Sequence, residues 1–157
     1  MKPRPTEYEG QLFRSKTEAV FARSLDLASV AWDYEPSGLK IDDGYVPDFL
    51  APENILGALV AMVIEIKPST VTPQYRREWE DRAEEMVGRC GIIPMSFLLI
   101  EGWHYGGVVP FVTTLIDGET DSFLIGDRPE GFVSWVHSHA SEASSYRFDL
   151  QDPVLTS

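Results

Sequence analysis

A run of apolar residues in the first half of the chain predicts a strand buried inside a sheet. From Leu59 to Ile66 the only charged residue is Glu65, and Lys67 directly follows this run. A continuous apolar run of this length is typical of a strand that is covered on both faces. Residues two apart on a strand point the same way, so Glu65 and Lys67 are expected to project together from one face. Pro68 then ends the strand.

Two segments have the apolar spacing of amphipathic helices. Ser15-x-x-Glu18 is a capping-box pattern, which starts a helix that runs to about residue 29. Thr72 and Pro73 begin a second helix over residues 74–89, because threonine caps helices well and proline suits the first helical position. The expected buried stripes are Glu18, Phe21, Leu25 and Ala28 in the first helix and Tyr75, Trp79, Ala83, Met86 and Cys90 in the second.

Shorter apolar segments, separated by turn residues, predict the remaining elements. The expected strands are Trp32–Glu35, Tyr45–Leu50, Ala58–Lys67, Ser96–Ile100, Phe111–Ile116 and Ser122–Ile125. Residues 38–44 and 51–57 are expected to form turns, and the glycine-rich segment 102–110 a loop with Trp103 at its tip. Residues 132–136 fit either a strand or the start of a terminal helix. The first ten residues, which include two prolines, indicate an irregular arm.

The order of helices and strands predicts an α/β fold of the α+β kind, with a central mixed sheet flanked by helices. The 157 residues are enough for one domain with a proper core. We divide that domain into the arm (1–10), a core (11–100) and C-terminal strands with a tail (101–157). A Rossmann fold is excluded because no Gly-x-Gly-x-x-Gly follows a strand. The single cysteine, Cys90, excludes an internal disulfide and a cysteine-ligated metal site.

The charge of the chain argues against a free-standing DNA-binding protein, although unevenly along its length. The 13 Lys and Arg against 25 Asp and Glu give a net charge of −12, whereas a nucleic-acid binder usually carries a basic face. Eleven of the 13 basic residues lie before residue 90. Any surface for DNA is therefore expected in the N-terminal part, and the affinity for DNA is expected to be weak without a partner.

Two acidic side chains on neighbouring predicted strands form a candidate metal site. Asp48 follows Pro47, one strand before Glu65. Burying a charge is unfavourable unless it is paired or binds a metal, and carboxylate oxygens suit Mg²⁺ or Mn²⁺. Such a metal polarises a phosphate and activates a water molecule, while Lys67 stabilises the charge that develops. The alternative is structural: Asp48 caps a turn, and Glu65 forms an ion pair with Lys67.

Four short motifs, taken in order, resemble the PD-(D/E)xK nuclease superfamily. They are Phe13–Ala19, Trp32–Pro36, Tyr45–Phe49 and Glu65–Pro68. The set is similar to the TnsA-like branch, which includes small endonuclease-like proteins of phages and actinobacteria. The resemblance implies a restriction-endonuclease-like core, Mg²⁺- or Mn²⁺-dependent cleavage of phosphodiester bonds, and a metal site completed by a helix glutamate, here Glu18. The alternative for Glu18 is a capping role, since it is also the third residue of the predicted helix.

Basic and polar side chains near the two predicted helix starts are candidates for contact with DNA. Arg14, Lys16, Arg76 and Arg77 are placed to reach backbone phosphates. The resemblance also implies a polar residue at the start of the second helix, near the attacking water or the phosphate, and Gln74 occupies that position. The alternative is that these are ordinary solvated side chains.

Two functions from different classes remain open. The first is a metal-dependent DNA endonuclease of a phage, a mobile element or a defence system, with DNA as its partner, including branched or single-stranded DNA. The second is an acidic binding or regulatory protein that keeps the nuclease fold but acts through protein contacts, which the net charge of −12 favours. The sequence shows no signal segment and no apolar stretch long enough to span a bilayer, so a cytoplasmic protein is expected.

Overall fold

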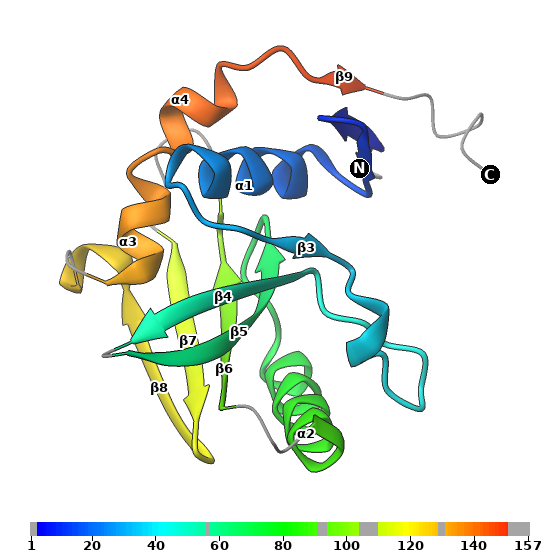
Figure 1. The fold of residues 1–157 in the computed structure, drawn as a ribbon, viewed down its shortest axis with the longest axis vertical. Helices are drawn as coiled ribbons and strands as arrows, with labels where there is room; N and C mark the ends of the chain where they lie inside the picture. Colours follow the sequence, from blue (N-terminus) through cyan, green and yellow to red (C-terminus); the bar gives the residue numbers. More distant parts are fainter. Residues whose placement is uncertain (1–2, 56, 91–93, 104–109, 129–130, 151–157) are drawn as a thin grey trace.

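A six-stranded mixed sheet forms the centre of the computed structural model, which describes residues 3–55, 57–90, 94–103, 110–128 and 131–150. The strands, in spatial order, are β3 (Asp33–Tyr34), β4 (Phe49–Ile55), β5 (Ala58–Lys67), β6 (Met95–Glu101), β7 (Phe111–Ile116) and β8 (Glu119–Leu124). Strands β5 and β6 run parallel, whereas the other neighbours are antiparallel. The predicted mixed sheet with flanking helices is confirmed (Figure 1).

Helices cover both faces of this sheet (Figure 1). They are α1 (Lys16–Leu27), α2 (Pro73–Cys90), α3 (Phe132–His137) and α4 (Ala140–Ser144), with short 3₁₀ turns η1 (Ser37–Leu39) and η2 (Ile125–Asp127). One face packs against α1 and α3, with α4 packed on α1, and the other face packs against α2, because β5 directs Ile64 to the first group and Val63 to the second. Glu65 and Lys67 alternate with Ile64, so they lie on the α2 face.

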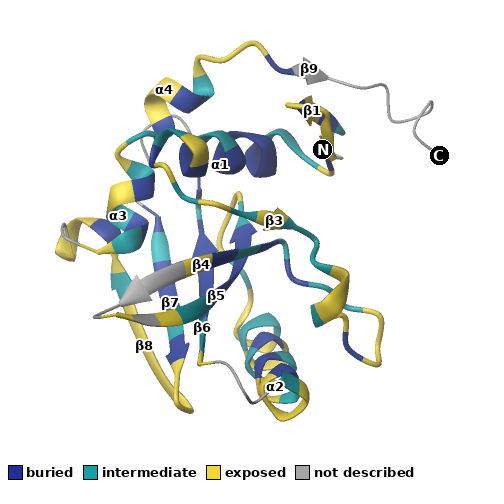
Figure 2. Ribbon diagram, viewed as in Figure 1, coloured by how far each residue is buried: buried dark blue, intermediate teal, exposed yellow. Residues whose placement is uncertain are grey.

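Both long helices begin where the sequence predicts. Ser15 is the N-cap of α1, and its side chain accepts a hydrogen bond from the Glu18 backbone N–H at 3.2 Å. The Thr72 hydroxyl likewise accepts from the Tyr75 N–H at 3.1 Å at the start of α2. These oxygens satisfy N–H groups that have no partner within the helix. The buried stripe predicted for α1 is confirmed. Of the stripe predicted for α2, Trp79, Ala83 and Met86 are buried against the sheet, whereas Tyr75 and Cys90, at its two ends, are only partly buried (Figure 2).

The strand before β5 differs from the predicted one. It begins at Phe49 rather than at residue 45, and it continues to Ile55 through the segment that was expected to turn. Its residues pair with β5 from Phe49, opposite Ile64, to Ile55, opposite Ala58. Pairing along the whole of β5 satisfies backbone groups that would otherwise need other partners. This gain outweighs the turn preference of the polar segment around Pro52.

The predicted N-terminal arm is wrong, because the first residues form part of a second sheet. Its strands are β1 (Thr6–Tyr8), β2 (Gln11–Phe13) and β9 (Asp149–Leu150), in the order β2-β1-β9. Tyr8 is buried, and the turn between β1 and β2 uses positive φ angles at Glu9 and Gly10. Strands of three residues are too short for alternation to reveal them, and packing on α1 stabilises them here.

Further differences concern the C-terminal part. Trp103 is not at a loop tip but fully buried, with its ring centroid 4.9 Å from that of Phe21 in an edge-on contact. The remainder of that predicted loop, residues 104–109, lies outside the described residues. Strand β8 starts earlier than expected, at Glu119. For residues 132–136 the helical alternative is confirmed, since they belong to α3.

Candidate functional site

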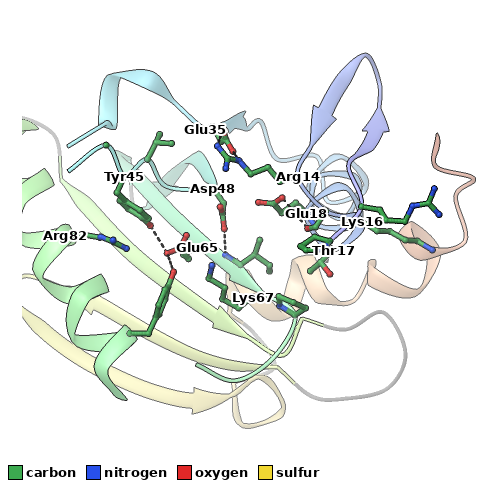
Figure 3. A pocket seen from close by; sticks show the side chains of 18 residues that line it. Arg14, Lys16, Thr17, Glu18, Glu35, Tyr45, Asp48, Glu65, Lys67 and Arg82 are labelled. Carbon is green, nitrogen blue, oxygen red and sulfur yellow. Dashed lines mark hydrogen bonds and ion pairs between the residues drawn. The ribbon is translucent and has the colours of Figure 1, made fainter. Parts of the chain in front are cut away.

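A cleft of about 730 Å³ lies where the C-terminal end of β5 meets the first turns of α1 and α2 (Figure 3). Its lining includes five of the 13 basic residues and four of the 25 acidic ones. These residues are Arg4, Arg14, Lys16, Lys67 and Arg82, with Glu18, Glu35, Asp48 and Glu65. The lining is therefore slightly positive within a chain of net charge −12. The cleft combines carboxylates that suit a cation with basic groups that suit an anion.

Glu65 is held on the cleft wall by two tyrosines. The Tyr75 hydroxyl donates to Glu65 Oε2 at 2.6 Å, and the Tyr45 hydroxyl donates to the same oxygen at 2.8 Å (Figure 3). Burial, and then the charge of Glu65, raise the pKa of both tyrosines, so both hydroxyls stay protonated and remain donors. Because both hydrogen bonds go to Oε2, the other oxygen, Oε1, is the one suited to a ligand.

Asp48 lies beside Glu65, immediately before β4. Its Oδ2 accepts a hydrogen bond from the Ile66 backbone N–H at 2.9 Å, which fixes the carboxyl group next to β5. Burial raises the pKa of Asp48 well above its ordinary value, and the charges of Glu65 and Glu18 raise it further. The Ile66 hydrogen bond and Lys67 act in the opposite direction but do not compensate. A cation bound beside Asp48 would offset the repulsion from Glu65 and Glu18.

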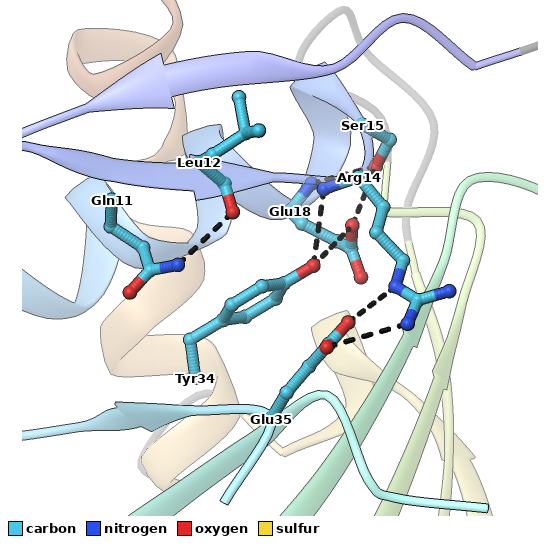
Figure 4. Close-up of polar contacts among 7 residues, drawn as sticks. All are labelled: Gln11, Leu12, Arg14, Ser15, Glu18, Tyr34 and Glu35. Atoms are coloured by element: carbon cyan, nitrogen blue, oxygen red, sulfur yellow. Dashed lines mark hydrogen bonds and ion pairs between the residues drawn. The ribbon is translucent and has the colours of Figure 1, made fainter. Parts of the chain in front are cut away.

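Glu18 is placed so that either of the two roles left open by the sequence is available to it. Its backbone N–H donates to the Ser15 side chain at the N-cap, its Oε1 accepts from the Ser15 hydroxyl at 3.3 Å (Figure 4), and its side chain also lines the cleft. The Tyr34 hydroxyl donates to the same oxygen at 3.2 Å. Burial raises the pKa of Glu18, whereas hydrogen bonding with Asp48, Tyr34 and Ser15 lowers it. The helix start thus brings a third carboxyl group next to Asp48.

The carboxyl groups of the cleft fit a hard divalent cation bound mainly by two of them. None of the ion pairs among the described residues involves Glu18, Asp48 or Glu65, so no basic side chain neutralises them directly. Mg²⁺ commonly binds through one or two carboxylates and retains several waters. Within the described ranges, no group of three or more His, Cys, Asp or Glu is already arranged as a metal site. Asp48 and Glu65 are therefore the residues suited to hold the ion, with Glu18 adjacent.

Lys67 stands on the same face as Glu65 without pairing with it. Its Nζ lies 5.1 Å from the centroid of the Tyr75 ring, and no ion pair of Lys67 occurs among the residues that the structure describes. The ion pair with Glu65, the structural alternative, is accordingly not formed there. The Trp103 backbone N–H donates to the Lys67 backbone carbonyl at 3.0 Å and anchors this end of β5. The ammonium group is thus positioned at the cleft by packing rather than by a counter-charge.

No family model, no curated protein and no solved structure matches this chain. Among the helices in the described ranges, none is long and apolar enough to cross a membrane. What the molecule does must therefore be argued from the residues of the cleft.

The structure separates the five residues expected to contact nucleic acid. Arg14 and Lys16 line the cleft. Arg76 instead pairs with Glu101, a buried carboxylate, at 2.9 Å. Gln74 and Arg77 are exposed on α2, outside the residues that line the cleft.

Other cleft residues escaped the sequence analysis. The sequence predicts Arg4 within the arm and Glu35 at the end of a short strand, with no functional signal at either. The helical spacing places Tyr75 in a buried stripe, and no local pattern gives a role to Tyr45 or Arg82. Arg82 lies two helical turns after Tyr75, and this spacing on one helix face was the available signal. Its guanidinium lies over the Tyr45 ring, 4.3 Å from the centroid.

Proposed function

We propose that this chain is a Mg²⁺- or Mn²⁺-dependent endonuclease that hydrolyses phosphodiester bonds in DNA. The observation that carries the proposal is the meeting of Asp48, Glu65 and Lys67 in one cleft that also contains basic side chains. Their order along the chain, with Glu18 on α1, is that of the PD-(D/E)xK superfamily, which the sequence resembles. The mixed sheet with helices on both faces supports a restriction-endonuclease-like core of this type.

In this proposal the acidic residues and the lysine have separate tasks. Asp48 and Glu65 hold the metal ion, and Glu18 adds a carboxyl group beside Asp48. The bound ion supplies a Lewis acid that polarises the phosphate and lowers the pKa of a water molecule. Lys67 orients the attacking water and stabilises the negative charge that grows on the phosphate.

The basic side chains of the cleft bind the phosphates of the strand. Arg14, Lys16 and Arg82 are placed for this, and such contacts set the position of DNA without reading its sequence. Because few basic residues take part, the affinity should be low and should fall steeply with salt. The expected place of action is the cytoplasm of a bacterial or phage-infected cell, in a phage, mobile-element or defence system, as the resemblance implies.

Nicking of supercoiled plasmid tests this proposal. Wild type with Mg²⁺ or Mn²⁺ should nick, and Lys67→Ala should lose about 10²–10³ in rate while it still binds the metal. Lys40→Ala is the matched control, because Lys40 is exposed and lies outside the cleft lining. Equal rates for Lys67→Ala and wild type would place the activity elsewhere.

A specific surface favours the second function, a binding or regulatory protein. The outward side of α2 carries the exposed acids Glu78, Asp81 and Glu84, which would suit a basic protein partner. The same plasmid assay discriminates the two functions when it is combined with metal binding. A chain that neither binds Mn²⁺ nor nicks DNA supports the second function.

A further inference from the structure

A second cavity of about 420 Å³ adjoins the cleft. The two share Arg14 and Glu35, whose side chains form an ion pair, so this pair stands at their common boundary. The other lining residues come from the segment before β1, from β2 and from β3: Pro5, Gln11, Leu12, Phe13 and Tyr34. The cavity therefore exists only because the first residues of the chain fold into a hairpin.

The lining places polar groups around one aromatic ring. Figure 4 shows the Tyr34 ring between Gln11 on one side and Arg14 with Glu35 on the other. The Gln11 amide donates to the Leu12 backbone carbonyl at 3.0 Å, and the Leu12 side chain points away from Tyr34 (Figure 4). An amide, a guanidinium and a carboxylate thus provide both donors and acceptors close to a flat apolar surface.

The Tyr34 ring is held rigidly and is connected to the proposed metal site. Its centroid lies 4.5 Å from that of Phe13 and 5.4 Å from that of Phe49. Its hydroxyl accepts from the Arg14 N–H at 3.1 Å and donates to Glu18 at 3.2 Å. A group bound on this ring would lie next to the carboxyl groups of the cleft.

Glu35 is kept in an unfavourable backbone conformation at this boundary. Its φ is +46°, in the left-handed region that glutamate rarely adopts. Its N–H donates to the Asp48 carbonyl at 2.8 Å, and its carboxylate bonds Arg14. Strained residues of this kind are concentrated at functional sites. The strain here fixes the wall between the two cavities relative to Asp48.

We propose that this second cavity binds the base of an unpaired nucleotide adjacent to the phosphate in the cleft. A base has a flat face for Tyr34 and a polar edge for Gln11, Arg14 and Glu35, whereas a base inside a duplex is stacked and paired on those same surfaces. The preferred substrate is then single-stranded DNA or an unpaired segment. This inference rests on the proposed nuclease function, because the cleft must hold the neighbouring phosphate.

Binding measurements on matched strands test the inference. Fluorescence anisotropy is recorded with the Lys67→Ala chain and Mg²⁺, so that bound DNA is not cut. The probes are an oligothymidine of about ten nucleotides, an abasic chain of the same length, and the corresponding duplex. The oligothymidine should bind about tenfold or more tighter than the abasic chain, since stacking on an aromatic side chain contributes that much, and tighter than the duplex.

Variants locate the preference for a base in the cavity. Tyr34→Leu and Gln11→Ala should reduce the ratio of the two single-strand affinities, whereas Tyr34→Phe keeps the ring and should keep the ratio. Both Tyr34 variants also lose the hydrogen bond from the Tyr34 hydroxyl to Glu18. A resulting change at the metal site alters the affinities for both single strands equally and leaves their ratio unaltered.

Three outcomes decide the matter. A ratio that falls in Tyr34→Leu but not in Tyr34→Phe supports the cavity. The Lys67→Ala chain, in which Tyr34 and Gln11 are unchanged, could instead bind the oligothymidine and the abasic chain with equal affinity. If wild type still nicks plasmid, this result overturns the base site and leaves the nuclease proposal standing. Binding to none of the probes, together with no nicking, overturns both.

Discussion

Two buried glutamates at the ends of neighbouring parallel strands have opposite environments. Glu101, at the end of β6, accepts two hydrogen bonds from Arg76 at 2.9 and 3.2 Å and one from the Val71 N–H at 2.8 Å. Glu65, near the end of β5, is bonded by the neutral hydroxyls of Tyr45 and Tyr75. Both side chains are almost fully buried. Only Glu101 has its charge offset by a basic group.

The difference separates a structural carboxylate from one that is available to a ligand. The Glu101 contacts tie the first turn of α2 to the sheet and use up the charge of Arg76. The charged groups around Glu65 include a second carboxyl group, Asp48. The negative charge of this pair is therefore not compensated unless a cation binds. A buried charge is tolerated only when it is compensated, so the missing compensation at Glu65 points to the ligand.

The largest expected effect comes from removing the charge of Glu65. Glu65→Gln keeps an oxygen that can accept from the tyrosines but weakens metal binding, so the rate of plasmid nicking should fall about 10²–10³-fold. Without metal, the free energy of unfolding in urea should not decrease, because one of several crowded negative charges is gone. A clear loss of stability in Glu65→Gln would make Glu65 a structural residue like Glu101.

Addition of Mn²⁺ should stabilise the fold through the cleft alone. At about 100 times the dissociation constant, the gain in the free energy of unfolding is about 2.7 kcal/mol. Thermal unfolding should show this gain for wild type and for Glu101→Gln, and not for Asp48→Asn. An unchanged melting temperature of wild type would favour the binding-protein function.

The Glu101 site should respond in stability. Glu101→Gln weakens the paired hydrogen bonds with Arg76 and should lower the free energy of unfolding by about 2 kcal/mol. The loss is no larger because Arg76 is partly exposed and water can solvate it in the variant. Glu78→Gln, at an exposed position on α2, is the matched control and should stay within about 0.5 kcal/mol of wild type. Urea unfolding with EDTA measures both, and equal values for the two variants would contradict the comparison.

The two tyrosines should act on metal affinity. Tyr75→Phe and Tyr45→Phe each remove one donor to Glu65 Oε2, so the carboxylate is less well oriented. Loss of such a supporting contact typically lowers metal affinity about tenfold or more. Titration with Mn²⁺ measures the change, and Tyr146→Phe, on the exposed C-terminal segment, is the control. Wild-type affinity in both cleft variants would show that Glu65 is oriented by other contacts.

The pH dependence should be the most gradual of these effects. The pKa values of Asp48 and Glu18 are higher in the folded state than in the unfolded state. At pH values between the unfolded-state and folded-state pKa values, the folded state therefore binds more protons. In EDTA the free energy of unfolding should therefore decrease as pH rises above about 4 through the raised values. Asp48→Asn should flatten this curve. A rise in wild-type stability over the same range would contradict the assigned directions.

Local features of the fold were predictable from the sequence. The start of α1 at the Ser15 cap, the start of α2 at Thr72, and the apolar strand β5 all follow from short-range signals. Elements stabilised by distant partners were mispredicted. Strand β4 continues through a polar segment because β5 lies alongside it, and β1 and β2 form because they pack on α1.

The candidate site divides in the same way. Period-two alternation by itself places Glu65 and Lys67 on one face, and helical spacing turns Glu18 inward, because these relations depend only on neighbours within one element. Which basic residues reach the cleft was decided by the tertiary structure. Arg76 is held away from the cleft by Glu101, 25 residues along the chain, whereas Arg82 lies over the Tyr45 ring in the cleft wall. No local pattern reports such pairings, because they depend on how separate elements pack together.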